Sequence, residues 1–130
     1  MRRLCFLSAN SLALVFALAA FVPNAHASNC GMLSYSIDDA RTKLKRAANE
    51  TDFESAKDYA RRAKSALDDA AMAAMDCKCD MAYSEFDTAA SRARRARDAD
   101  DVDEFVDSLN RSIRSFNSAL EALLSCPRNR

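Results

Sequence analysis

The stretch MDCKCDM, residues 75–81, lies near the middle of the 130-residue chain and holds two cysteines separated by one lysine. Cys30 precedes Cys77 by 47 residues, and Cys126 follows Cys79 by the same 47 residues. The chain therefore matches itself without a gap at an offset of 49 residues. Such self-similarity at a fixed spacing indicates an internal duplication.

The repeats are expected over about residues 30–77 and about 79–126, and other side chains recur at the same offset. Gly31 and Pro127 are the only glycine and proline after residue 27, and both lie at the edges of this region. With no helix breaker inside and with many alanine, lysine and arginine residues, each repeat is predicted to form two helices. The four helices are expected over about residues 33–48, 52–76, 81–97 and 102–125.

The starts of two helices carry capping signals. Thr51 followed by Glu54 predicts the start of the second helix, and Asp101 followed by Glu104 predicts the start of the fourth.

Apolar residues in every helix recur at alternating steps of three and four, which predicts an all-α, antiparallel up-down-up-down four-helix bundle. Alanine dominates these seams and allows close approach of the helix axes. On the fourth helix the seam is Val102, Phe105, Leu109, Ser112, Phe116, Ala119, Leu123 and Cys126.

Four cysteines allow three disulfide pairings. A bond between Cys77 and Cys79 would close a strained small ring. Bonds Cys30–Cys77 and Cys79–Cys126 would staple each repeat at its open end, whereas Cys30–Cys79 and Cys77–Cys126 would tie the two repeats together. We favour the staples because they respect the duplication, and each would contribute roughly 4 kcal/mol by closing a long loop.

Residues 1–27 have the order of a cleaved secretory signal peptide. Arg2 and Arg3 precede an apolar stretch that is densest over residues 12–22, and Ala25-His26-Ala27 offers a small-residue cleavage site. The alternative is an uncleaved membrane anchor, but the apolar run is shorter than the ~20 residues of a membrane span. Once the signal peptide is cleaved, no stable membrane span is expected. The remaining four-helix domain, residues 28–130, is expected to be periplasmic or secreted.

The composition of residues 28–130 limits the function. This part holds all 19 acidic residues, 17 of the 19 basic residues and no histidine. A slightly acidic domain is poorly suited to nucleic acid, whose phosphates are bound through basic side chains. No nucleophile, general base or glycine-rich loop forms a catalytic pattern, so no enzyme activity, cofactor or metal is expected. The main expectation is a non-catalytic interaction or structural role in the cell envelope or outside the cell.

One alternative is a soft-metal, copper-binding or thiol redox protein. Four methionines are expected at the same bundle end as the cysteines, and thiolate and thioether sulfur suits Cu(I). Oxidised cysteines cannot supply thiolates, however, and methionines also serve as packing residues. The methionines in question are Met32, Met72, Met75 and Met81.

The second repeat differs from the first along one column of its last helix. Val106, Ile113 and Leu120 widen the apolar face of that helix, and we interpret them as a possible interaction ridge for an unknown protein partner or a homodimer. The alternative is that they complete the core of a small bundle. The matching positions on the second helix are Lys57, Lys64 and Ala71.

Basic residues gather at the ends of the first and third helices, and each group is followed by acidic residues. Cations stabilise helix C-termini, and pairing across the turns is expected to neutralise both groups. The alternative is a patch that holds an acidic partner or an anionic lipid. The groups are Lys43, Lys45 and Arg46 in the first repeat and Arg92, Arg94, Arg95 and Arg97 in the second.

Overall fold

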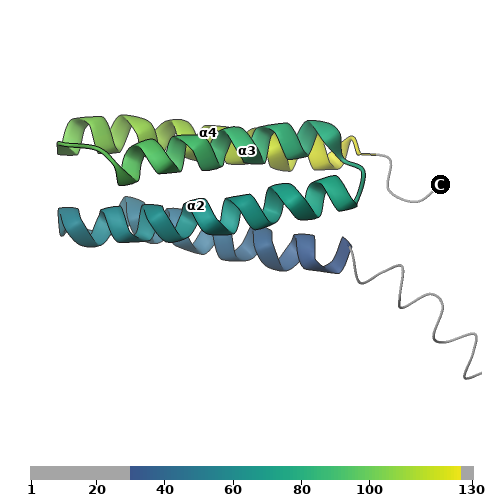
Figure 1. Cartoon of the computed structure of the whole chain (residues 1–130), viewed down its shortest axis with the longest axis horizontal. Helices are drawn as coiled ribbons and strands as arrows, with labels where there is room; N and C mark the ends of the chain where they lie inside the picture. The colour runs from purple at the N-terminus through teal and green to yellow at the C-terminus, as the bar shows by residue number, and fades with distance from the viewer. Residues whose placement is uncertain (1–29, 127–130) are drawn as a thin grey trace, which may run out of the picture.

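The computed structural model describes residues 30–126, and the predicted signal peptide lies outside these residues. Within them the chain forms four helices, namely residues 30–49, α2 (Phe53–Asp76), α3 (Asp80–Arg97) and α4 (Val102–Leu124). α3 packs along both α2 and α4, whereas α2 and α4 barely touch (Figure 1). The predicted all-α four-helix bundle is confirmed. No helix within residues 30–126 has the length and apolar character needed to cross a membrane.

Aspartates cap both α2 and α4. The Asp52 carboxylate accepts a hydrogen bond from the Ser55 amide at 2.8 Å, so the prediction that Thr51 caps α2 was wrong by one residue. An aspartate is the stronger N-cap, because its negative charge also interacts favourably with the helix dipole. The Asp101 carboxylate caps α4 as predicted, accepting from the Glu104 amide at 2.9 Å.

A single residue reverses the chain between α2 and α3. Lys78 adopts a left-handed conformation with φ of 60°. Its amide donates to the Met75 carbonyl at 2.9 Å, and the Cys79 amide donates to the Ala74 carbonyl at 2.9 Å. These two bonds form a Schellman motif, in which glycine usually occupies the left-handed position. The motif satisfies two of the last carbonyls of α2 and directs α3 back along it.

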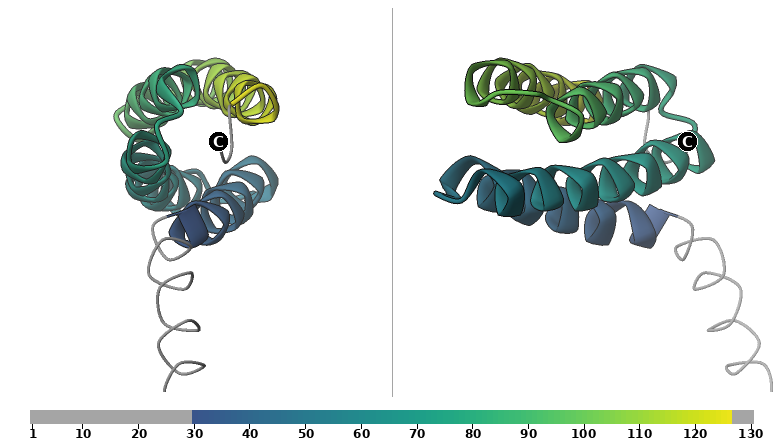
Figure 2. Two further views of the ribbon diagram at one scale, coloured as in Figure 1. Left: turned by 90° about the vertical axis from the view of Figure 1, so that its right-hand side faces the viewer. Right: turned by 60° about the vertical axis from the view of Figure 1, so that its left-hand side comes forward.

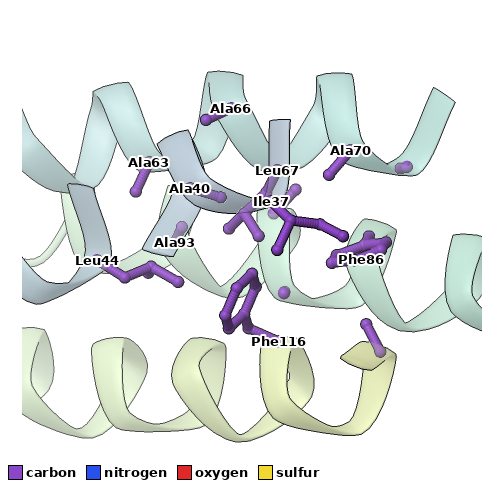
Figure 3. Packing of buried hydrophobic residues seen from close by; sticks show 14 of the residues in the cluster. Ile37, Ala40, Leu44, Ala63, Ala66, Leu67, Ala70, Phe86, Ala93 and Phe116 are labelled. Carbon is purple, nitrogen blue, oxygen red and sulfur yellow. The ribbon is translucent and has the colours of Figure 1, made fainter. Parts of the chain in front are cut away.

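Alanine provides most of the core, and a few large side chains fill the space between the helices (Figure 3). The rings of Phe86 and Phe116 lie with their centroids 6.0 Å apart. Near the two inter-helix turns, Phe53 and Phe105 meet edge to face with centroids 5.8 Å apart. These two rings close that end of the core, and Val102 is 55% exposed. The prediction that Val102 belongs to the buried seam was therefore wrong.

Two disulfides close the opposite end of the bundle. Cys30 is bonded to Cys77 and Cys79 to Cys126, with the Cα atoms 5.5 Å apart in both pairs. These are the two hairpin staples favoured from the sequence. Each joins the first residue of a hairpin to its last, so both hairpins are fixed at the ends that their turns leave open.

Candidate interaction groove

A groove lies on the surface between the first helix and α4, the two helices that stand at the ends of the C-shaped arrangement in the end view of Figure 2. Its volume is about 390 Å³, and Leu44 and Phe116, both almost fully buried, form its floor. We call this feature the α4 groove. It is lined by Arg41, Leu44, Lys45, Ala48, Asn49, Ile113, Phe116 and Asn117.

A smaller hollow of about 150 Å³ continues the α4 groove toward the start of α2. The two share Ala48, and the hollow also takes in Val106 and Asn110 of α4. The α4 residues that line the groove and the hollow run from Val102 to Asn117. At a rise of 1.5 Å per residue this corresponds to about 22 Å of helix.

The predicted interaction ridge contributes one wall of this surface. Val106 is 46% exposed, whereas Ile113 and Leu120 are half-buried and pack against the core. Val106 and Ile113 line the hollow and the groove respectively, and Leu120 lines neither. The column is thus part ridge and part core, and its accessible portion faces the first helix.

The 49-residue offset shows how this seam differs from its counterpart between α2 and α3. Ala71 and Ala90 are both buried, at the positions that match Leu120 and Arg41. Alanine at such positions lets two helices approach closely, and α2 and α3 do pack tightly along their length. Larger side chains replace both alanines at the seam between the first helix and α4.

Arg41 reaches across the α4 groove. Its guanidinium carbon lies 5.9 Å from the centroid of the Phe116 ring, within the range of a cation–π contact. The same guanidinium donates to the Asp38 carboxylate at 2.9 Å, and both side chains are more than half exposed. Arg41 therefore covers part of the apolar floor while staying in contact with solvent.

Lys45 and Arg46 continue the positive charge along the first helix. Neither has an acidic partner within 4 Å among residues 30–126. The Arg46 guanidinium instead lies 5.8 Å from the Tyr59 ring, beside an open depression of about 650 Å³. We call Arg41, Lys45 and Arg46 the basic shelf.

The corresponding turn of the second repeat is partly neutralised, since Arg95 has no ion pair among residues 30–126. Asp98 pairs with Arg97 at 2.7 Å and lies 3.9 Å from Arg94. The hydrogen bond from Arg97 lowers the pKa of the Asp98 carboxyl. The residue 49 positions earlier is Asn49, which carries no charge. The expected pairing is therefore found in part at the second turn, through Asp98. In the first repeat Lys43 pairs with Asp39 of its own helix, and no pair within the described part of the chain crosses the turn.

The sulfur-rich end offers a different chemistry. Met32, Met72, Met75 and Met81 have exposed fractions between 49% and 73%, and all four described cysteines are in disulfides. In this state the accessible sulfur ligands are thioethers alone. Within residues 30–126 no three His, Cys, Asp or Glu side chains are grouped so as to hold a metal ion.

The buried polar groups at the contact of α3 and α4 are satisfied within the bundle. The Ser112 hydroxyl donates to the Ala89 carbonyl at 2.8 Å, and Arg92 donates to the Ser115 hydroxyl at 2.7 Å. No buried side-chain nitrogen or oxygen among the described residues lacks a partner. These serines hold α4 against α3 and leave the opposite flank of α4 to the groove.

Comparisons of the chain with protein families, curated proteins and solved structures gave no match. The α4 groove and the basic shelf beside it are therefore the features from which a function can be inferred.

Proposed function

We propose that the protein is an exported, disulfide-stapled helical module that binds a protein partner through the α4 groove, without catalysis. The observation that carries this proposal is the difference between two seams at matching positions of the repeats. Small residues close the seam between α2 and α3, whereas the seam between the first helix and α4 leaves an apolar recess of about 390 Å³. Accessible apolar recesses bordered by polar residues are typical of binding surfaces.

The cysteine chemistry supports a location outside the cytoplasm. Two disulfides within a domain of this size favour an oxidising compartment, the periplasm or the extracellular space. The predicted signal peptide at residues 1–27 points to the same location. A partner should therefore be sought among envelope or secreted proteins.

The copper or thiol redox alternative requires cysteines that are reduced in the working protein. Titration of free thiols under denaturant separates the two functions. We expect no free thiol in the exported protein. Four free thiols together with bound copper by elemental analysis would instead establish the alternative.

Photo-crosslinking in cells that export the protein tests the groove itself. A photoreactive residue at position 48 lies where the α4 groove and its continuing hollow meet. Position 97 is the matched control, 49 residues later on α3. We expect a discrete adduct from position 48 that the exposed change Val106→Lys abolishes, and no adduct from position 97. Equal adducts from both positions, or none from position 48, would contradict the proposal.

A further inference from the structure

The geometry points to an amphipathic α-helix of a partner protein, with a row of acidic residues beside its apolar row, as the occupant of the α4 groove. This inference rests on the proposed function and specifies the chemistry of the partner. Three observations carry it, namely the shape of the groove, the basic shelf along one wall and the uncharged residues along the other.

The shape of the groove fits a helix. It lies between two helices, and together with its continuing hollow it follows about 22 Å of α4, the length of roughly four helical turns. A helix satisfies its own backbone hydrogen bonds, and no strand occurs among residues 30–126 to pair with an extended peptide. Apolar side chains spaced three and four residues apart would reach the floor over Leu44, Ile113 and Phe116.

The charge of the two walls differs. Arg41 and Lys45 line the wall formed by the first helix, with Arg46 beyond them and Glu50 just past the end of the helix, whereas Asn110 and Asn117 line the wall formed by α4. A partner helix with carboxylates on one flank would place them along the basic shelf. Complementary charge of this kind sets the orientation of a partner and rejects like-charged helices.

Arg41 is placed to change partners when such a helix binds. Its present contacts are an exposed ion pair with Asp38 and the face of Phe116. Exposed ion pairs contribute little, so a carboxylate of the incoming helix can take the guanidinium at low cost. An apolar side chain of the same helix would then cover the Phe116 ring.

A second copy of this chain does not supply the required chemistry. The positions nearest the accessible apolar column of α4 are Asn110 and Asn117, and the exposed carboxylates on that flank, Asp103 and Glu121, stand toward the two ends of the helix, so α4 of another copy would bring amides to the middle of the shelf. The first helix of another copy would bring Arg41 and Lys45 against the same residues, and like charges repel. The charge pattern of these two helices therefore favours a different protein as the source of the acidic row.

Synthetic helices provide the direct test. Three fluorescent peptides of roughly four turns are compared by anisotropy on the exported, oxidised protein. The first has leucines at helical spacing with glutamates along one flank, the second has lysines in place of the glutamates, and the third is a scramble of the first. We expect the first to bind about tenfold or more tighter than either of the others, with an affinity that falls as salt rises.

Charge reversal locates the binding. Arg41→Glu with Lys45→Glu should invert the preference in favour of the lysine peptide. The matched control, Arg94→Glu with Arg95→Glu, makes the same charge change in the second repeat and should leave the preference unchanged. Melting temperatures of both variants verify that the bundle remains folded.

Several outcomes would overturn the inference. Equal binding of the glutamate and lysine peptides, or no binding of any peptide, would exclude an acidic helix. Equal binding of the scrambled peptide would indicate a diffuse anion-binding face of the kind that suits an acidic glycan or lipid surface. A crosslinked adduct of two copies from position 48 would make the groove a homodimer interface. A heterologous adduct without preference for the acidic helix would leave the proposed function intact and reject this partner class alone.

Discussion

The guanidinium of Arg41 lies over the ring of Phe116 and joins the first repeat to the last helix across the α4 groove. At the matching position of the second repeat stands Ala90, which is 2% exposed. The seam between α2 and α3 has the methyl group of Ala90 at this position and is closed. The seam between the first helix and α4 has the long polar side chain of Arg41 there and is open. The basic shelf and the groove both include this arginine.

Replacing Arg41 with alanine is expected to destabilise the protein slightly. The change removes an exposed cation–π contact and an exposed ion pair, and the expected loss of unfolding free energy is about 0.5–1 kcal/mol. Arg61→Ala is the matched control, because Arg61 has a similar ion pair with Asp58 and is not placed over an aromatic ring. Urea denaturation compares the two variants. A loss above about 2 kcal/mol for Arg41→Ala would mean that the arginine is a structural residue of a closed seam.

Each disulfide should contribute a similar stability, because both close loops with a sequence separation of 47 residues. Replacing either cysteine pair with serine is expected to cost roughly 4 kcal/mol in the chain-entropy model. Denaturant unfolding of the two double variants measures the loss. If one pair proved neutral, the corresponding hairpin would be held by its packing rather than by its staple.

The acid stability of the protein should depend partly on Asp98. The hydrogen bond from Arg97 lowers the pKa of this carboxyl below its ordinary value of 3.8. The stabilising contribution is therefore present above pH 3.8 and is lost as the pH falls through the lowered folded value. The variant Asp98→Asn carries the residue found at the matching position 49 of the first repeat. As the pH falls through this acidic range, its melting temperature should drop less than that of the wild type. The exposed residue Asp87, which has no ion pair among residues 30–126, gives the control variant Asp87→Asn. If the melting temperatures of the wild type and of Asp98→Asn fell in parallel with pH, Asp98 would not contribute to the acid sensitivity of stability.

The left-handed residue between the disulfides offers a stabilising change. Lys78 has φ of 60°, a conformation that costs roughly 1–2 kcal/mol for a residue with a side chain. Glycine removes this cost but gains entropy in the unfolded chain, so Lys78→Gly should stabilise by up to about 1 kcal/mol. Lys78→Ile should be destabilising, since a β-branched residue fits this conformation poorly. Equal melting temperatures for the two variants would argue against the left-handed turn.

The sequence was sufficient to predict the bundle, because the cysteine spacing and the steps of three and four survive in the structure with little change. It was less informative about the width of the buried faces. Ala71 and Ala90 lie beside the predicted seam and are buried nonetheless, since small residues let α2 and α3 meet over a broad surface. Alanine tolerates both burial and exposure, so its presence alone does not indicate which will occur.

The α4 groove was only partly predictable from the sequence. The column of Val106, Ile113 and Leu120 was visible as a departure from the repeat, but its sequence did not indicate how deeply each side chain would be buried. Arg41 was not identified as a site residue, and Lys45 was named only in the alternative of a patch for an acidic partner or an anionic lipid. Two differences between the repeats could have indicated the groove, namely Arg41 in place of Ala90 and Asn49 in place of Asp98. A difference in charge at matching positions means that the seam between the first helix and α4 cannot be equivalent to the seam between α2 and α3.

The most direct test of the binding role converts the α4 column to the residues of the first repeat. Val106→Lys with Ile113→Lys recreates Lys57 and Lys64 at the matching positions. Because Val106 is 46% exposed and Ile113 half-buried, the unfolding free energy should fall by less than about 2 kcal/mol. The same protein should form no crosslinked adduct from a photoreactive residue at position 48. A larger loss of stability, with the adduct still formed, would show that the column belongs to the core and would contradict a binding role for the α4 groove.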